Sequence, residues 1–118
     1  MAVTPRFKDF VVEQLEGCGP IVTKGMFGGV GIYSGDVFFA LIDDDILYLK
    51  VDDSTRPQFQ RAGGAPFDPY GDGRPSLHYY SVPVSVLEDA DALMAWGRRA
   101  IAAASQKPAG SPKRRGRK

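Results

Sequence analysis

The spacing of apolar residues near the start of the chain predicts an amphipathic helix. Thr4 is a residue type that caps helices, and Pro5 is tolerated at the first helical position. Gly17 and the Gly19-Pro20 pair mark the end of this helix. Its apolar face consists of Phe7, Phe10, Val11 and Leu15, which recur at helical intervals.

Extended, β-prone segments follow this helix. Residues 21–33 are predicted as a first long strand, which takes in most of a glycine-rich stretch that runs from Lys24 to Gly35. Residues 37–42 and 46–51 are predicted as the second and third strands, with turn signals at 34–36 and 43–45. Strands joined by such short loops must run antiparallel, because a parallel pair needs a long crossover.

The second half of the chain returns to helix, strand and helix. A short helix is predicted at residues 55–62, extended structure at 66–70, a strand at 76–82 and a long helix from Asp89 onward. Residues 85–88 form a separate helical turn in this prediction. The predicted class is therefore α+β in two layers, an antiparallel sheet of about five strands packed with helices in the order α-β-β-β-α-β-β-α.

Charge divides the chain into two parts. Residues 107–118 contain six Lys or Arg and no acid, whereas residues 1–106 carry nine basic and 14 acidic side chains, a net charge of −5. We therefore expect a folded domain over 1–106 and a disordered basic tail over 107–118. The tail resembles an arm that binds nucleic acid without sequence specificity; the competing interpretation is a solubilising tail. The cations nearest the end are Lys113, Arg114, Arg115, Arg117 and Lys118.

Several classes of protein are excluded by composition. The apolar runs are too short to span a bilayer, and the first residues lack the apolar segment of a signal peptide, so we expect a cytoplasmic protein without membrane contact. A single cysteine, Cys18, cannot form an internal disulfide or a cysteine-based zinc site. We interpret it as a small buried side chain near the end of the first helix.

The glycine-rich stretch lacks the features of a phosphate-binding loop. A dinucleotide fingerprint needs a third glycine and a following helix, but Ser34 stands at the third position and a turn and strand follow. No Gly-Lys-Ser/Thr sequence follows either, and no cofactor is predicted. We interpret Gly28, Gly29 and Gly31 as positions where another backbone, the first helix or an aromatic ring packs closely.

Other candidates for chemistry have simpler interpretations. His78 is the only histidine and has no local nucleophile signature, so a partly exposed strand residue is favoured over a catalytic one, and no catalytic or metal-binding residue is predicted. The acidic run at residues 43–45 is interpreted as a solvated turn, not a cation site. The strand aromatics could form a base-stacking platform, but core packing is favoured for most of them. These are Tyr33, Phe38, Tyr48, Tyr79 and Tyr80.

Several motifs in a fixed order resemble those of the TfoX (Sxy) N-terminal domain family. The first is the Met-Phe-Gly-Gly-Val-Gly-Ile-Tyr segment, followed by Phe-Ala-Leu, by Leu-Tyr-Leu-Lys-Val-Asp at 47–52, and by Tyr-Tyr-Ser-Val-Pro at 79–83. The resemblance covers residues 5–105. The residues that carry it most clearly are Met26, Phe27, Gly28, Gly29, Gly31, Tyr33, Tyr80 and Pro83.

This resemblance implies a fold similar to type III secretion chaperones, and kinship with regulators of competence and DNA transformation, some of which act with the catabolite activator protein on promoters. The helical C-terminal domain of full-length regulators has no counterpart here, so we expect a stand-alone domain. The family supplies no catalytic residues. We therefore expect a non-enzymatic regulator that contacts a protein partner, such as the transcription machinery, and whose tail adds non-specific affinity for DNA or RNA. The alternatives are a chaperone-like homodimer and, less favoured, a small enzyme using His78.

Overall fold

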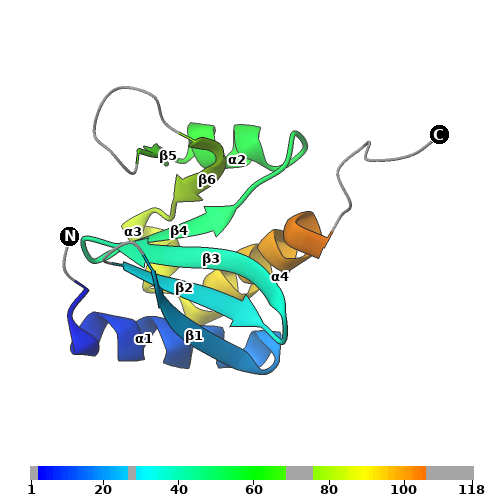
Figure 1. The fold of residues 1–118 in the computed structure, drawn as a ribbon. Helices are drawn as coiled ribbons and strands as arrows, with labels where there is room; N and C mark the ends of the chain where they lie inside the picture. Colours follow the sequence, from blue (N-terminus) through cyan, green and yellow to red (C-terminus); the bar gives the residue numbers. More distant parts are fainter. Residues whose placement is uncertain (1–2, 27–28, 69–75, 106–118) are drawn as a thin grey trace.

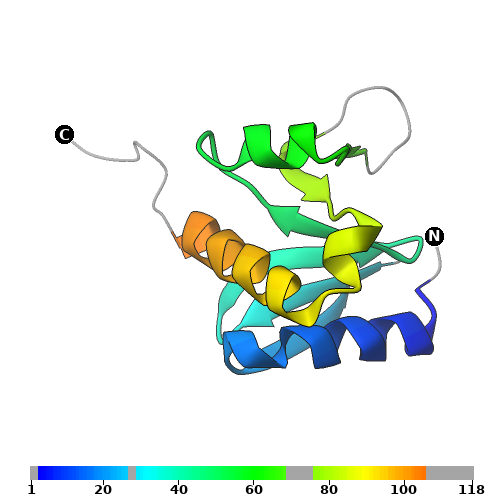
Figure 2. The same cartoon turned by 180° about the vertical axis from the view of Figure 1, so that it is seen from behind.

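An antiparallel sheet forms the front layer of the molecule and helices form the back layer (Figures 1 and 2). This computed structural model describes residues 3–26, 29–68 and 76–105. Within those residues the sheet has six strands in the order β1-β2-β3-β4-β6-β5. The strands are β1 (Ile21–Met26), β2 (Gly29–Ser34), β3 (Val37–Asp43), β4 (Ile46–Lys50), β5 (Pro66–Phe67) and β6 (Ser76–Ser81). The helices are α1 (Pro5–Leu15), α2 (Arg56–Arg61), α3 (Val84–Leu87) and α4 (Ala90–Ser105), and a 3-10 turn, η1 (Glu16–Cys18), follows α1.

The α+β class and the antiparallel pairing are confirmed, but the glycine-rich stretch is not one long strand. Its first residues end β1, and its later residues form β2, which pairs with β1 so that Met26 lies opposite Gly29. The predicted order therefore lacks one strand before α2. The glycines hid this hairpin because they contribute no side chains to an alternating pattern.

The helices cover one face of the sheet. α4 packs across β3 and β4, α1 packs against α4, and α2 lies at the β6 end. The core between the layers is apolar and includes Leu15 of α1, Ile32 of β2, Leu49 of β4 and Leu93 of α4, all fully buried. The ring of Phe59 on α2 packs 4.5 Å from that of Trp96 on α4, which joins α2 to the same core.

A β-bulge changes the direction of side chains in β3. Ile32 pairs with Ala40, but the next residue, Tyr33, pairs with Phe38, so Phe39 is the extra residue. Paired residues lie on the same face of a sheet. Phe38 therefore points with Tyr33 to the side away from the helices, while Phe39 is fully buried in the core.

The turn between β3 and β4 is tied to the start of α1. Asp44 and Asp45 have φ angles of 55° and 56°, as both central residues of a two-residue type I′ hairpin loop require. The carboxylate of Asp45 accepts hydrogen bonds from the backbone N–H and the hydroxyl of Thr4, the N-cap of α1. The prediction of a turn is confirmed, but Asp45 is a structural hydrogen-bond acceptor and not a merely solvated charge.

The close neighbour of Gly29 is the backbone of β3. A Cβ atom at this position would collide with the carbonyl oxygen of Ile42. Of the contacts expected for this glycine, an approaching backbone is therefore the correct one, and neither the first helix nor an aromatic ring is needed. Gly31 is buried and pairs with Lys24 and Leu41, whereas Gly28 lies outside the described residues.

Candidate binding surface

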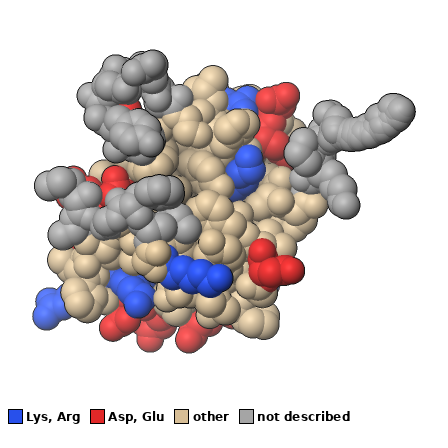
Figure 3. Space-filling view, in the orientation of Figure 1, with Lys and Arg blue, Asp and Glu red and all other residues tan. Residues whose placement is uncertain are grey.

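The front face of the sheet carries no helix within the described residues (Figure 1). Three aliphatic side chains on its strands are markedly exposed: Val22 at 43%, Ile46 at 41% and Leu77 at 53%. In space-filling view this face is largely uncharged, with basic patches inside it and acidic side chains mostly toward its margins (Figure 3). Large exposed apolar groups gathered on one face are typical of a surface that contacts another molecule.

A continuous row of rings and lysines crosses this face. The ring centroids of Tyr33 and Phe38 are 5.1 Å apart, and those of Phe38 and Tyr79 are 5.7 Å apart. The ammonium of Lys24 lies 5.1 Å from the Tyr33 centroid, and that of Lys50 lies 5.6 Å from the Tyr79 centroid. We call these five residues the lysine–aromatic row. Both lysines are within the distance at which a cation is attracted to a ring face.

The register of the sheet assembles this row from five strands. β1 contributes Lys24, β2 contributes Tyr33 and β3 contributes Phe38, whose outward direction depends on the bulge. Lys50 of β4 and Tyr79 of β6 are directly paired. Lys24 and Tyr79, which are 55 positions apart in the chain, thus lie on the same face of the sheet.

The charges in the row have little compensation. Among the described residues neither Lys24 nor Lys50 forms an ion pair; the one salt bridge there joins Arg56 to Asp53. The pKa of Lys50 is lowered, first by burial and then by the nearby Arg56, with Asp52 acting in the opposite direction. Burial and the phenol of Tyr33 raise the pKa of Tyr79.

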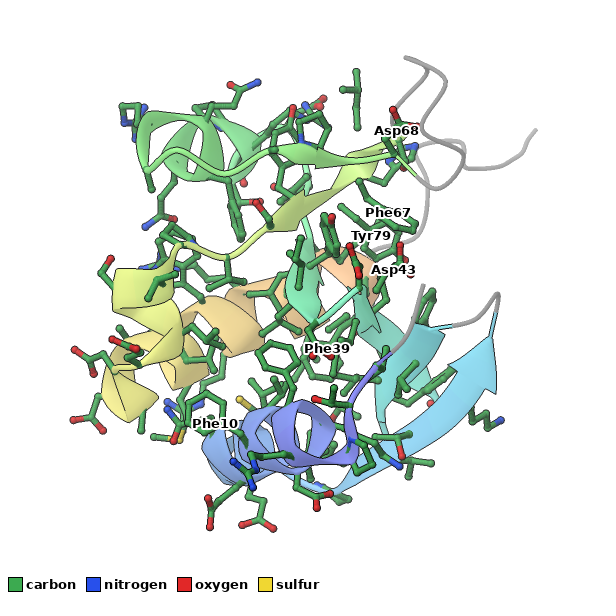
Figure 4. All side chains as sticks on the ribbon, turned by 90° about the vertical axis from the view of Figure 1, so that its left-hand side faces the viewer. Phe10, Phe39, Asp43, Phe67, Asp68 and Tyr79 are labelled. Atoms are coloured by element: carbon green, nitrogen blue, oxygen red, sulfur yellow. The ribbon has the colours of Figure 1, made fainter. Side chains whose placement is uncertain are left out.

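A second aromatic pair lies at the acidic end of the same face, where the rings of Tyr48 and Phe67 are 4.8 Å apart. Burial raises the pKa of Tyr48, and the carboxylates of Asp43, Asp44 and Asp68 raise it further. Figure 4 shows Asp43, Phe67, Asp68 and Tyr79 on the side of the sheet away from Phe10 and Phe39. We call Asp43, Asp68, Tyr48 and Phe67 the acidic corner. The face therefore has basic side chains within it and an acidic corner at one margin.

The expectation that most strand aromatics pack in the core is wrong for four of the five. Tyr80 alone is buried there, and its hydroxyl accepts a hydrogen bond from Gln60 at 3.2 Å. The other four are half-buried on the front face: Tyr33, Phe38, Tyr48 and Tyr79. Sequence reasoning did not select Lys24 and Lys50 at all. Both lysines lie in predicted strand segments that also contain aromatic residues, and this was the only sign of them in the sequence. The register of the sheet is needed to show that Lys24 lies over Tyr33 and Lys50 over Tyr79.

The motif residues do not gather at one point. Gly29, Gly31 and Tyr33 lie on β2, Tyr80 is in the core, and Pro83 is the N-cap of α3. The backbone of Met26 ends β1, whereas Phe27, Gly28 and the tail with Lys113, Arg114, Arg115, Arg117 and Lys118 lie outside the described residues. Most of the motif therefore specifies strands and core rather than a site.

The candidates for catalysis or metal binding lie apart from one another. The exposed imidazole of His78 makes no hydrogen bond or ion pair with any residue in the described segments. Those segments also contain no group of three or more His, Cys, Asp or Glu placed to hold a metal ion. Cys18 is half-buried, and its Sγ lies 3.5 Å from the carbonyl oxygen of Met94.

Comparison with models of known protein families finds a match. The family model of the TfoX N-terminal domain matches residues 13–104 of the 118. The chain belongs to the TfoX N-terminal domain family. The match takes in all six described strands of this TfoX N-terminal domain, and therefore the whole lysine–aromatic row.

A search among curated proteins finds no matching relative for this TfoX N-terminal domain.

In the described part of the chain, none of the helices has the length and apolar character needed to cross a bilayer.

Proposed function

We propose that this TfoX N-terminal domain is a non-enzymatic binding module that acts by contacting another protein through the front face of its sheet. The observation that carries the proposal is the lysine–aromatic row, together with the exposed Val22 and Leu77 beside it. Protein interfaces are enriched in tyrosine and phenylalanine, and a few such aromatic residues supply most of the binding energy.

A binding role has more support than a catalytic one. A general base must reach a proton or a partner at hydrogen-bond distance, and the imidazole of His78 has no partner in the described segments. Within the described segments the front face, in contrast, offers rings, aliphatic groups and cations but no assembled nucleophile. A role for His78 in a small enzyme therefore stays the least supported alternative.

Family membership supports a regulatory role for this module, related to competence and transcription, in which the protein partner belongs to the transcription machinery and the chain works in the cytoplasm. We further propose that the basic tail, residues 107–118, adds non-specific affinity for DNA or RNA. If deleting residues 107–118 leaves duplex DNA binding unchanged across a salt titration, the proposal for the tail is wrong.

A chaperone-like homodimer is the second candidate, favoured by one observation. β1 lies at the edge of the sheet and has six residues, so its outer side offers backbone groups for pairing with a second copy. Light scattering at micromolar concentration separates the two candidates, because a monomer removes the premise of the homodimer.

The test of the main proposal uses three exposed aliphatic residues. Val22→Glu combined with Leu77→Glu places charges on the front face, whereas Val84→Glu places one on α3, behind the sheet, where the side chain is 65% exposed. We expect the double variant to lose the proteins that the wild-type chain retains from native lysate, and the Val84 variant to retain them. Equal retention by all three, with unchanged circular dichroism, would overturn the proposal.

A further inference from the structure

The partner of the front face can be described chemically from the charges and rings that the face presents. The argument rests on the proposed function, because it concerns the same surface. Lys24 lies over the ring of Tyr33 and Lys50 over the ring of Tyr79, and neither lysine forms an ion pair with a carboxylate in the described segments. Lys24 is exposed, whereas Lys50 is half-buried and lies near Arg56, with only Asp52 acting in the opposite direction. An incoming anionic group would therefore stabilise the charge of Lys50 and could pair with the exposed ammonium of Lys24.

The spacing of the two lysines sets the size of the complementary segment. β1 and β4 are separated by three strand spacings, or about 14 Å at about 4.8 Å each, and the register places Lys50 two residues further along its strand, so the two backbones are about 16 Å apart. That distance corresponds to about eleven residues of α-helix or about five residues of extended chain. Tyr33 and Phe38 lie on the strands between the two lysines, and the ring of Tyr79 lies on β6, next to Lys50. These rings accept apolar side chains.

The acidic corner favours a protein over a nucleic acid. A strand of DNA or RNA has a phosphate at every nucleotide, so one that extended from the row to the Tyr48 ring would come near the carboxylates of Asp43 and Asp68. A protein segment can instead confine its carboxylates to the two lysines. The flanking residues Val22 and Leu77 are aliphatic and offer no ring on which a base could stack.

We propose that the lysine–aromatic row binds an acidic protein segment in which two carboxylate-bearing regions flank a short run of apolar or aromatic residues. The carboxylates pair with Lys24 and Lys50, and the apolar run covers Tyr33 and Phe38, with Tyr79 beside Lys50. The partner is thus recognised by matched charge at two points and by aromatic contact between them.

The experiment selects ligands for the full chain from a phage-displayed library of random twelve-residue peptides. We expect the selected peptides to be enriched in Asp and Glu on both sides of aromatic or aliphatic residues. Lys24→Glu combined with Lys50→Glu should weaken their binding by about tenfold or more, because a tenfold change corresponds to the loss of only one close charge pair. Peptides with each acid changed to Lys should recover binding to this double variant.

A matched control keeps the net charge of the variant but leaves the row intact. Lys8→Glu combined with Arg61→Glu alters α1 and α2, which do not belong to the row, and should bind the selected peptides as the wild-type chain does. A library that yields no binders, or binders without acidic enrichment, would overturn the proposal. Equal binding by the Lys24/Lys50 variant would overturn it as well.

Nucleic acid forms the third arm. A fluorescent fifteen-nucleotide oligo(dT) is titrated into the full chain and into the Lys24/Lys50 variant. We expect the same affinity for both, because the row is not its site; a tenfold loss in the variant would make the row a nucleic-acid surface and overturn the proposal. Failure here is distinct from failure of the proposed function, since Val22→Glu with Leu77→Glu would still abolish the protein contact.

Discussion

The carboxylate of Asp45 holds Thr4 at two points. It accepts the backbone N–H of Thr4 at 2.8 Å and the Thr4 hydroxyl at 3.0 Å. The same hydroxyl oxygen accepts a hydrogen bond from the N–H of Phe7 and so caps α1. One threonine therefore connects the β3–β4 turn to the first turn of a helix 41 residues earlier in the chain.

Removing this connection should destabilise the fold. Thr4→Ala loses both the helix cap and the contact with Asp45, so we expect the free energy of unfolding to fall by about 1–2 kcal/mol in urea titrations. Thr4→Ser should lose much less. Asp45→Asn keeps a residue type that tolerates the positive φ, and together with Thr4→Ala it completes a double-mutant cycle. A coupling energy near zero would show that the contact does not form in solution.

Gly29→Ala should lower the melting temperature. The added methyl group would meet the carbonyl oxygen of Ile42 in the neighbouring strand, and forced packing of this kind typically costs about 1–3 kcal/mol. Gly25→Ala is the matched control, because its nearest neighbour would lie 4.0 Å away, at ordinary contact distance. Similar melting temperatures for the two variants would contradict the close approach of β2 and β3.

Asp52 should make folding sensitive to acid. Its carboxylate accepts hydrogen bonds from the Ser54 hydroxyl at 2.7 Å, the Ser54 N–H at 2.9 Å and the Thr55 N–H at 3.0 Å. These bonds lower the pKa of Asp52 below its ordinary value of 3.8, the Ser54 hydroxyl contributing most. A depressed carboxyl pKa stabilises the fold above the unfolded pKa and loses that effect as pH falls through the folded pKa.

Urea unfolding from pH 5 downward to about pH 2 tests this sign. The wild-type chain should lose stability through that range, and Asp52→Asn should lose less, because it has no proton to bind. Asp36→Asn, at the exposed turn after β2, should keep the wild-type slope. An Asp52→Asn slope equal to that of the wild type would refute the assignment.

Cys18 should react slowly with thiol reagents near neutral pH. Burial raises the pKa of its thiol, and Arg98 offsets part of the shift. Since the thiolate is the reactive form, the rate profile of Ellman's reagent against pH should lie at higher pH for the folded chain than for the chain in urea. Arg98→Ala should move it higher still. Coincident profiles for folded and unfolded chain would be inconsistent with this environment.

Elements with local signals could be predicted from the sequence. The start of α1 depends on Thr4 and Pro5, which act within one helical turn, and the β3–β4 turn depends on adjacent aspartates. The long periodic pattern of α4, with Leu93 and Ala100 buried, was equally clear. The β1–β2 hairpin was missed because its glycines leave no alternation from which to count.

The binding surface depended on contacts that no local pattern contains. Phe38 and Phe39 stand in an uninterrupted apolar run, so nothing in the run shows that one ring enters the core and the other leaves it. Lys50 meets Tyr79 only because β6 pairs with β4 after a long excursion through α2 and β5. The strand aromatics were identified correctly as candidates, but their assignment to a face required the register.

Phe39 is an extra residue in β3. The face to which the neighbouring side chains point therefore depends on the number of residues between Val37 and Ala40. With one residue fewer between Val37 and Ala40, β3 would alternate without interruption, and the residue facing Tyr33 would be the one that now fills the core. The row would keep a phenylalanine opposite Tyr33, but the core would lose the ring that fills it. A chain that has both the row and the buried ring must therefore keep the number of residues between Tyr33 and Ala40, even where it replaces the residues themselves.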